Sequence, residues 1–579
     1  MKTRTTIWPL CAMLAAVTPA CAQKATAVHE PARLLAAPPD GPAYLARSQE
    51  AARLVSAGQL DAAEQVYEEI TRTYPIQGDA WIRLADVRFR LRNFREAADA
   101  YAKAADLLGP SAVGRPRYGQ AVSLVQAGDT DAALAAIDDL VFETRYVRRP
   151  SLYDDPNFAS LRTHPAFIRA TGRDVAAATL PRVEGWRRDI DYLLSEMKRI
   201  EPEFHDKPIS PEIARQARDL SAAVPSLSDD EVLVGIWRII GSLGHGHTGL
   251  FPFVPSRREY HQLPMQLYAF PEGIFVVAAS GDAADLAGAQ IVAIEGTPAL
   301  DALKKVGAMQ GNESGMQVLW TGAYHVGVTE ILKGLGITRD VNRVGLSLRL
   351  PTGETVQRTV QAIPLTRWQK LVPPPKVSAP LFLQRVAQQH WFVDLPDKDA
   401  MFVQVNQVQP SSNETLAAFG LRLRDSLAVS RSRNVILDLR HNNGGNTYLY
   451  PELVRTLVSF TTQRDRQLYV ITGRGTYSAA ANLITDLERF ANPIFVGEPS
   501  SMTGNNAGDE SMFVLPYSGL NGAFSSVRWQ LSHPWDIRRS IVPQMPVQLT
   551  AAAYFRGEDP VLDAITRRIA AERAGRRAQ

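Results

Sequence analysis

The stretch from Arg433 to Gly497 constrains the fold of this chain more than any other part of the sequence. It opens with an apolar run from Val435 to Leu439, rich in β-branched residues, which is typical of a buried strand. The run leads into a polar segment that contains the paired glycines Gly444 and Gly445. Such a pair suits a turn whose backbone angles other residues avoid, and it leaves backbone N–H groups uncovered. We therefore expect a buried strand that enters a tight glycine turn.

A second strand and a helix follow, and Ser478 lies at their junction. Residues Gln467 to Thr472 have a strand pattern, which the segment Gly473 to Gly475 breaks. After Ser478, apolar residues recur at helical spacing: Leu483, Ile484, Leu487 and Phe490. A hydroxyl placed here lies at the positive end of a helix, where free N–H groups can hold a developing oxyanion. The alternative is an ordinary N-cap serine.

Motifs in this stretch and on both sides of it resemble the tail-specific (C-terminal-processing) and tricorn-core serine protease family. Asp438 to Gly445 matches the family's Asp-Leu-Arg-x-Asn-x-Gly-Gly turn, and Gly475 to Ala480 resembles its nucleophile segment. Val496 to Pro499 resembles the strand that follows, and Gly557 to Leu562 resembles the closing motif. Upstream, Leu243 to Thr248 is similar to the family's Asp-Gly-His-Thr segment. The resemblance extends over residues 180–570 and implies a serine-type peptidase.

The resemblance implies that Ser478 is the nucleophile, and it leaves a choice of base. Processing members of the family use a lysine after the serine, but no lysine follows Lys398 in this sequence. Of the candidate histidines, only His247 matches the base of tricorn-type members, whereas His441 and His533 do not. We expect His247 to take the proton of the serine. An imidazole of ordinary pKa, near 6.5, would make activity rise between roughly pH 6 and 7.5.

The resemblance also implies an oxyanion site built from backbone N–H groups. We expect one such group from Ala479, at the start of the helix. The other comes from Gly445 or from its neighbour Gly444. Asp438 and Arg440, at the start of the same turn, are expected to brace it.

A carboxylate should orient the imidazole of His247. Asp536 lies near the distance along the chain at which tricorn-type proteins place theirs, and Glu498 and Asp509 are alternatives. His245 occupies the place of the aspartate in the family's upstream segment. The identity of the acid is therefore open.

A metal site is the competing explanation for the pair His245 and His247. A His-x-His pair can ligate metal, and His441 could supply a third nitrogen. No carboxylate lies beside the pair at metal-ligand spacing. We expect neither a metal nor another cofactor.

Residues 1–22 have the form of a secretory signal peptide, with basic residues before an apolar stretch and a small-residue end at Ala22. Cleavage there would remove both cysteines, Cys11 and Cys21, and with them any thiol nucleophile or disulfide. We expect an exported protein, periplasmic or secreted. The alternative is a lipoprotein held at the membrane through Cys21. The net charge of +3 gives no reason to expect a nucleic-acid partner.

Residues 44–140 repeat with a period of 34, as the recurring pairs show: Ala63 and Tyr67, Ala97 and Tyr101, and less regularly Ala133 and Ile137. This period is typical of tetratricopeptide repeats, in which stacked helix pairs bury a shared apolar face. Such a stack offers a surface for a protein partner.

Two smaller parts separate the repeats from the core. Residues 180–250 form a helical segment that ends in the His-Thr motif, and Ser228 to Glu231 is a capping box within it. Residues 255–365 have the pattern of a small β-domain similar to a PDZ domain, with these expected strands: Met265 to Phe270, Ile274 to Ala278, Ile291 to Ile294 and Val344 to Leu350. A Pro-rich linker follows at residues 366–380.

Residues 381–570 alternate strands and helices, which favours parallel strands joined by crossover helices. The family resemblance implies that this α/β catalytic core is a ClpP/crotonase-like spiral. The whole chain is thus expected to be multidomain, with helical repeats, a helical segment, a small β-domain and the α/β core.

Two functions fit these features. The first is an exported peptidase that hydrolyses unfolded or C-terminal segments through Ser478 and His247. The second is a catalytically inactive relative that binds peptides or serves as a scaffold. The first is favoured because the sequence can fill each role of a nucleophile site.

Overall fold

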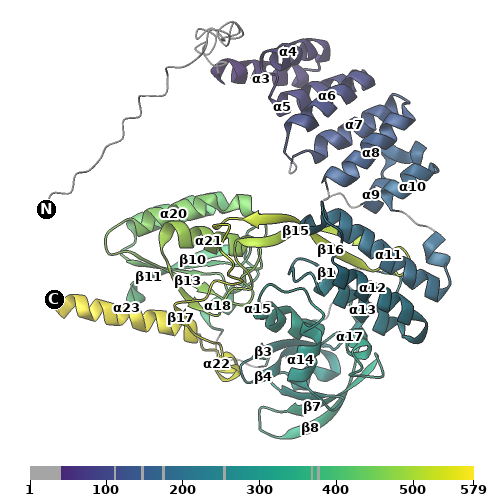
Figure 1. Cartoon of the computed structure of the whole chain (residues 1–579). Helices are drawn as coiled ribbons and strands as arrows, with labels where there is room; N and C mark the ends of the chain where they lie inside the picture. Colours follow the sequence, from purple (N-terminus) through teal and green to yellow (C-terminus); the bar gives the residue numbers. More distant parts are fainter. Residues whose placement is uncertain are drawn as a thin grey trace, which may run out of the picture. The chain divides into compact units, whose positions relative to one another are not determined.

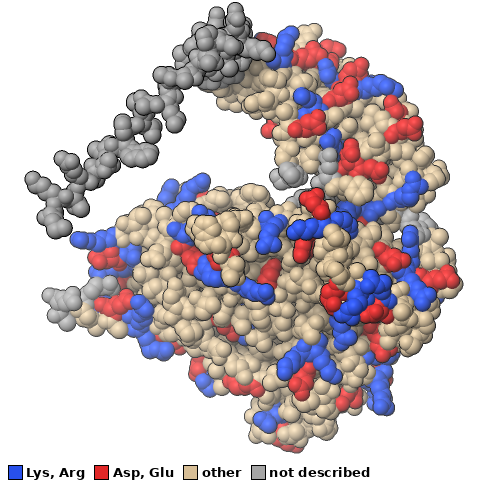
Figure 2. All heavy atoms as spheres, in the orientation of Figure 1, with Lys and Arg blue, Asp and Glu red and all other residues tan. Residues whose placement is uncertain are grey.

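The computed structural model describes residues 41–109, 112–144, 149–172, 176–251, 256–366, 370–374 and 379–578. The predicted signal peptide and both cysteines lie outside these residues, as does part of the predicted linker. The chain divides into two compact units, Met1–Glu143 and Thr144–Gln579 (Figure 1). Acidic and basic side chains are scattered and intermixed over the face seen in Figure 2. None of the helices in the described residues is both long and apolar enough to cross a membrane.

The first unit consists of helices that pack one upon the next along the chain: α3 (Gly41–Ser56), α4 (Leu60–Thr73), α5 (Gly78–Arg90), α6 (Phe94–Leu107), α7 (Gly114–Gln126) and α8 (Thr130–Thr144). The recurring residues of the sequence pattern are all buried: Ala63, Tyr67, Ala97, Tyr101, Ala133 and Ile137. The helical prediction for this region is confirmed. Its assignment as tetratricopeptide repeats stays a prediction.

The second unit contains an α/β core around a six-stranded sheet, in the order β10 (His390–Leu395), β11 (Ala400–Val405), β12 (Asn434–Asp438), β13 (Gln467–Thr472), β14 (Ile494–Gly497) and β17 (Met545–Pro546). From β11 to β17 all neighbouring strands are parallel, as predicted, and β10 pairs with β11 antiparallel. The strands are continuously apolar because helices cover both faces of the sheet. One face packs on α19 (Leu416–Val429), α20 (Pro451–Thr461) and α21 (Ala479–Ala491), and the other on α23 (Pro560–Ala578) (Figure 1).

The predicted β-domain is an antiparallel sheet of β3 (Met265–Phe270), β4 (Gly273–Ala279), β5 (Gln290–Ile294), β7 (Arg343–Arg349) and β8 (Thr355–Gln361), with α14 (Ala299–Gly307). Each of the four strands read from the sequence lies within one residue of its observed bounds. Likeness to a PDZ domain stays a prediction.

The helical segment consists of α11 (Arg182–Ile200), α12 (Pro211–Ala223) and α13 (Asp229–Gly241), and the predicted capping box begins α13. These helices share one hydrophobic cluster with the β-domain and with a hairpin of β15 (Asn505–Val514) and β16 (Asn521–Gln530). The short strand β1 (Gly249–Leu250), directly after the His-Thr motif, pairs with β16. The hairpin thus connects the upstream histidine segment to the α/β core.

Candidate active site

Ser478 lies in a strained backbone conformation between β13 and α21. Its φ is 54° and its ψ is −126°, a region that residues with a side chain rarely adopt. Its side chain makes no capping hydrogen bond to the helix that it precedes. The N-cap alternative therefore does not explain this serine. Strain of this kind costs roughly 1–3 kcal/mol per residue and gathers at functional sites.

The glycine turn packs directly against this serine. Gly444 and Gly445 have φ of 111° and 137°. A Cβ at position 444 would lie 2.6 Å from the Cβ of Ser478 and 3.0 Å from the backbone nitrogen of Ala479, so no side chain fits there. The backbone of the turn is held by Val408, whose N–H donates to the Gly444 carbonyl at 2.8 Å.

Two backbone N–H groups next to Ser478 are available to a ligand. The N–H of Gly444 already donates to the side chain of Asn442 at 3.0 Å. Those of Gly445 and Ala479 have no hydrogen bond within the described part of the chain. Of the two glycines considered for the oxyanion site, Gly445 is thus the one with a free donor. The oxyanion role itself stays a prediction.

Arg440 anchors the start of the turn to the C-terminal part of the core. Its guanidinium bonds to both carboxylate oxygens of Asp559, at 3.0 and 2.9 Å, and to Asp438 at 3.0 Å. It also lies over the ring of Phe382, 4.2 Å from the centroid. Arg440 and Asp438 therefore brace the turn, as expected, and the closing motif supplies Asp559 as a partner for Arg440.

His247 lies in the turn between α13 and β1, buried against the nucleophile segment. Its Nδ1–H donates to the carbonyl of Ala507 at 2.9 Å, and its ring stacks on Tyr477 with centroids 4.5 Å apart. This hydrogen bond places the proton on Nδ1 and leaves Nε2 as an acceptor. Nε2 is buried and has no hydrogen bond to any described residue. The ring of Tyr477, the residue before Ser478, thus lies against the imidazole of His247, whose Nε2 has no hydrogen-bond partner among the described residues.

Burial lowers the pKa of His247 to about 4, against a smaller opposite effect of the Ala507 carbonyl. The expectation that an ordinary imidazole would set the pH dependence is therefore wrong for this residue. The cause is desolvation, which disfavours the imidazolium. His247 is neutral at physiological pH, as a general base must be.

The three carboxylates predicted as the orienting acid all have other partners. Asp536 bonds to Arg538 and Ser532, and its pKa lies well below the usual range, chiefly because of Arg538. Glu498 pairs with Arg474 at 2.6 Å. Among the described residues, no hydrogen bond or ion pair joins Asp536 or Glu498 to His247.

Asp509, the remaining alternative, is exposed and accepts a hydrogen bond from Trp529 at 3.1 Å. The Nδ1 position of His247, where an orienting acid would bind, is occupied by a backbone carbonyl. None of the three predicted acids therefore binds the imidazole of His247.

His245, which stands where the family resembled in sequence has an aspartate, belongs to a buried polar network behind the site. Its Nδ1 lies 3.1 Å from a carboxylate oxygen of Glu201, and the Thr248 hydroxyl donates to the other oxygen at 2.8 Å. Burial opposes charging of His245, but the hydrogen bond and the charge of Glu201 outweigh it and raise its pKa. Within the described residues no group of three or more acidic, histidine or cysteine side chains could hold a metal ion.

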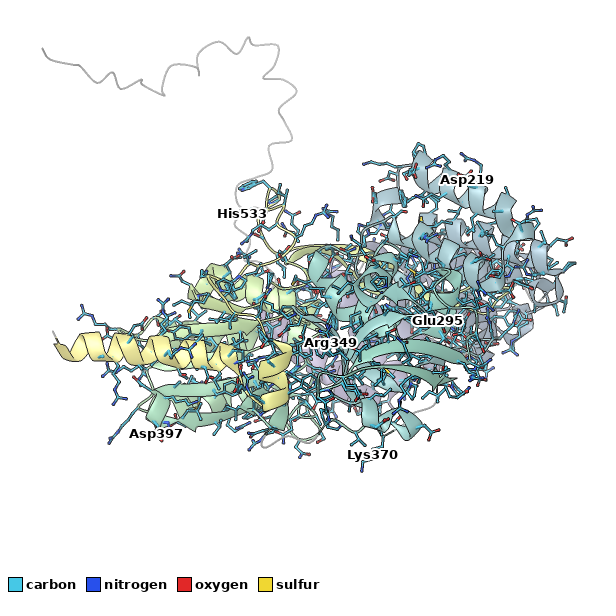
Figure 3. The ribbon with its side chains drawn as sticks, turned by 90° about the horizontal axis from the view of Figure 1, so that it is seen from below. Asp219, Glu295, Arg349, Lys370, Asp397 and His533 are labelled. Atoms are coloured by element: carbon cyan, nitrogen blue, oxygen red, sulfur yellow. The ribbon has the colours of Figure 1, made fainter. Side chains whose placement is uncertain are left out.

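The other two histidines lie apart from His247. His441 stacks on Phe382 beside the glycine turn, with ring centroids 5.7 Å apart, and burial lowers the pKa of His441. His533 stacks on the exposed Trp535 at 4.9 Å, on a loop that stands out from the ribbon (Figure 3). Neither shares a hydrogen bond with Ser478 in the described structure.

A loop that the sequence did not single out connects the two halves of the site. The Gln317 side chain donates to the carbonyl of Gly246 at 3.0 Å, and the Ser314 hydroxyl donates to the carbonyl of Ser501 at 2.8 Å. Trp320 packs on Tyr477 with ring centroids 5.6 Å apart. The cluster of polar residues and glycines at 310–315 was the only sequence signal for this loop, and such a cluster predicts merely a turn.

A cavity of about 1030 Å³ opens beside the glycine turn. It lies between β3 and the core, and its walls include Trp320, Tyr324, His441 and Asn443. Most of its lining is apolar, and Arg440 and Arg474 are among its charged lining residues. A cavity of this size can hold several side chains of an extended peptide.

No family model and no curated protein matches this chain by sequence. By structure it is similar to mature CPAF in complex with lactacystin, with a TM-score of 0.50 and 13% identity, over 67% of this chain and 98% of that one. The similarity to the photosystem II D1 C-terminal processing protease has a TM-score of 0.33 and 14% identity, over 65% of this chain and 98% of that one. The similarity to the tricorn protease has a TM-score of 0.34 and 12% identity, over 68% of this chain and 37% of that one. The resemblance inferred from the motifs is confirmed at the level of the fold.

Proposed function

We propose that this chain, which has the fold of the tail-specific and tricorn-core serine proteases, is a serine peptidase with Ser478 as nucleophile and His247 as base. One observation supports the proposal more strongly than any other. Ser478 is held in a strained conformation against a glycine turn that no side chain could replace, with free N–H groups of Gly445 and Ala479 beside it. A structural serine would need none of these features.

The chemistry follows from these groups. The Ser478 hydroxyl attacks the peptide carbonyl carbon while His247 Nε2 takes its proton. The N–H groups of Gly445 and Ala479 hold the negative oxygen of the tetrahedral intermediate. The imidazolium then gives its proton to the leaving amine. In the second half of the reaction, Nε2 takes a proton from the water that attacks the acyl carbon, and the imidazolium returns this proton to the leaving Ser478 oxygen.

The substrate class follows from the cavity and the fold. The mostly apolar walls beside the glycine turn favour an extended, unfolded peptide segment over a folded surface. We further propose that the protein acts after export, in the periplasm or outside the cell, as the form of residues 1–22 suggests.

Covalent labelling tests the proposal without knowledge of the substrate. A fluorophosphonate probe should label the purified protein, and Ser478→Ala should abolish labelling while leaving the thermal unfolding midpoint near that of the parent. Equal labelling of parent and variant would refute the nucleophile. A parent that no serine-directed probe labels would favour the alternative of an inactive peptide-binding scaffold, because Ser478 and His247 share no hydrogen bond in the described structure.

A further inference from the structure

Glu313 lies in the loop that packs on the His245–His247 turn. A Cβ at Gly311 would lie only 2.3 Å from the carbonyl oxygen of His245, so the two backbones are in direct contact. Gln317, a few residues later, donates to the carbonyl of Gly246. The loop therefore holds Glu313 against the turn that carries His247.

The carboxyl of Glu313 is buried and lacks a hydrogen-bond partner of normal geometry. Both of its oxygens are shielded from solvent, and it is the only described carboxyl for which both are buried and unpaired. A buried polar group without a partner is costly and calls for a functional explanation. The strongest effect on its ionisation is burial, which raises the pKa of Glu313 to about 7.

The groups around this carboxyl are those that anchor the catalytic imidazole. The peptide N–H groups of Gly246 and Ala507 face it and favour its charged form. Gly246 directly precedes His247, and the carbonyl of Ala507 accepts the Nδ1–H of His247. The carboxyl thus adjoins both backbone segments between which the imidazole is held.

We propose that Glu313 is the acidic positioning residue of this site, whose ionised carboxyl binds the N–H groups of Gly246 and Ala507 and stabilises the imidazolium formed by His247. The inference rests on the proposed function and supplies the acid that Asp536, Glu498 and Asp509 do not. Glu313 takes no proton from the substrate and makes no covalent bond.

The charges that face Glu313 determine the direction of its pH dependence. The positive charges of His245 and Arg539 favour the carboxylate, and they act against the dominant effect of burial. Tyr477 is neutral, because burial raises its pKa well above the ordinary value. Since the pKa of Glu313 is raised, the carboxyl is neutral below about pH 7 and ionised above it. His247 loses its proton near pH 4, so a rise in activity around pH 7 that disappears in Glu313→Gln would report Glu313.

The first test measures the rate constant for fluorophosphonate labelling of Ser478 between about pH 5 and 9. In the parent this rate should rise around pH 7. Glu313→Gln should remove that rise and lower the rate at high pH by roughly 10- to 1000-fold, since the imidazolium loses a nearby negative charge. Glu313→Asp should keep part of the rise. The matched control is Glu510→Gln, an exposed carboxyl that also acts on Tyr477 and should leave the profile unchanged.

A second readout separates this inference from the proposed function, because it needs no reactivity. The C2–H resonance of His247 in the NMR spectrum should shift around pH 7 in the folded parent, as the neighbouring carboxyl ionises. The shift should disappear in Glu313→Gln and persist in Glu510→Gln. An unchanged titration in folded Glu313→Gln would overturn the inference even if Ser478 reacts, whereas loss of the shift would support it even if Ser478 does not.

Discussion

At the scale of single residues, His247 combines two properties that a general base needs. Its Nδ1–H is fixed by the carbonyl of Ala507, and burial keeps the ring neutral at physiological pH. The stacking of Tyr477 fixes the plane of the ring next to Ser478. The low pKa of His247 makes its imidazole a weak base. The negative charge of a neighbouring carboxylate therefore becomes important when the imidazolium forms.

We predict that His247→Ala lowers turnover of a peptide substrate by roughly two to four orders of magnitude, the range for loss of a general base. His441→Ala and His533→Ala serve as controls and should cost much less, because their rings stack on Phe382 and Trp535 and not on Tyr477 beside Ser478. Steady-state kinetics on an unfolded protein substrate would measure all three. The base would have to be reassigned if His247→Ala kept near-parental turnover while a folded control variant lost it.

At the scale of elements, the glycine turn and the start of α21 act as one unit. The turn after β12 contacts the residue before α21 so closely that the positions of both elements depend on Gly444 lacking a side chain. Parallel strands deliver both segments to the same edge of the sheet, since β12 and β13 are neighbours. The strained conformation of Ser478 is maintained by this packing rather than by its own sequence.

Gly444→Ala should abolish labelling of Ser478 and lower the free energy of unfolding by roughly 1–3 kcal/mol, because it adds backbone strain and a clash with the nucleophile. The matched control is Gly353→Ala. Gly353 has φ of 90°, yet a Cβ there would meet nothing within 4 Å. The Gly353→Ala variant should lose stability through strain alone and keep the labelling of Ser478. Chemical denaturation measures the first effect and probe reactivity the second. Full labelling of Gly444→Ala would contradict the proposed geometry.

At the scale of the whole second unit, the site is assembled from segments far apart in the chain. His247 comes from the helical segment, Ala507 from the hairpin, and Ser478 from the α/β core. An ion pair links the closing motif to the glycine turn, because Asp559 binds Arg440, which lies 119 residues earlier in the chain. Both side chains of this ion pair are buried.

Asp559→Ala should destabilise the protein by roughly 3–5 kcal/mol, because it leaves the buried Arg440 without one of its partners. The neighbouring Glu558→Ala is the control, since its pair with Arg556 is exposed and screened by solvent and should contribute little to stability. Unfolding in urea, followed by circular dichroism, would compare the two. Equal effects of both variants would show that the tie between the closing motif and the turn contributes little.

Much of this architecture was determined by local sequence. The apolar run of β12, the paired glycines and the helical spacing after Ser478 depend on neighbouring residues, and so do the capping box of α13 and the strands of the β-domain. Periodicity and turn chemistry encode such elements directly. Ser478 and His247 could be named because each lies within such a local motif.

Only the tertiary structure decided which groups surround these two residues. The anchor of His247 is a backbone carbonyl, which has no sequence signature, and Asp536 is bound by Arg538 instead of the imidazole. The low pKa of His247 and the raised pKa of Glu313 both arise from burial, which depends on how distant segments pack. Local motifs could therefore point to Ser478 and His247, whereas the charged groups near them and their pKa values depend on desolvation in the folded chain.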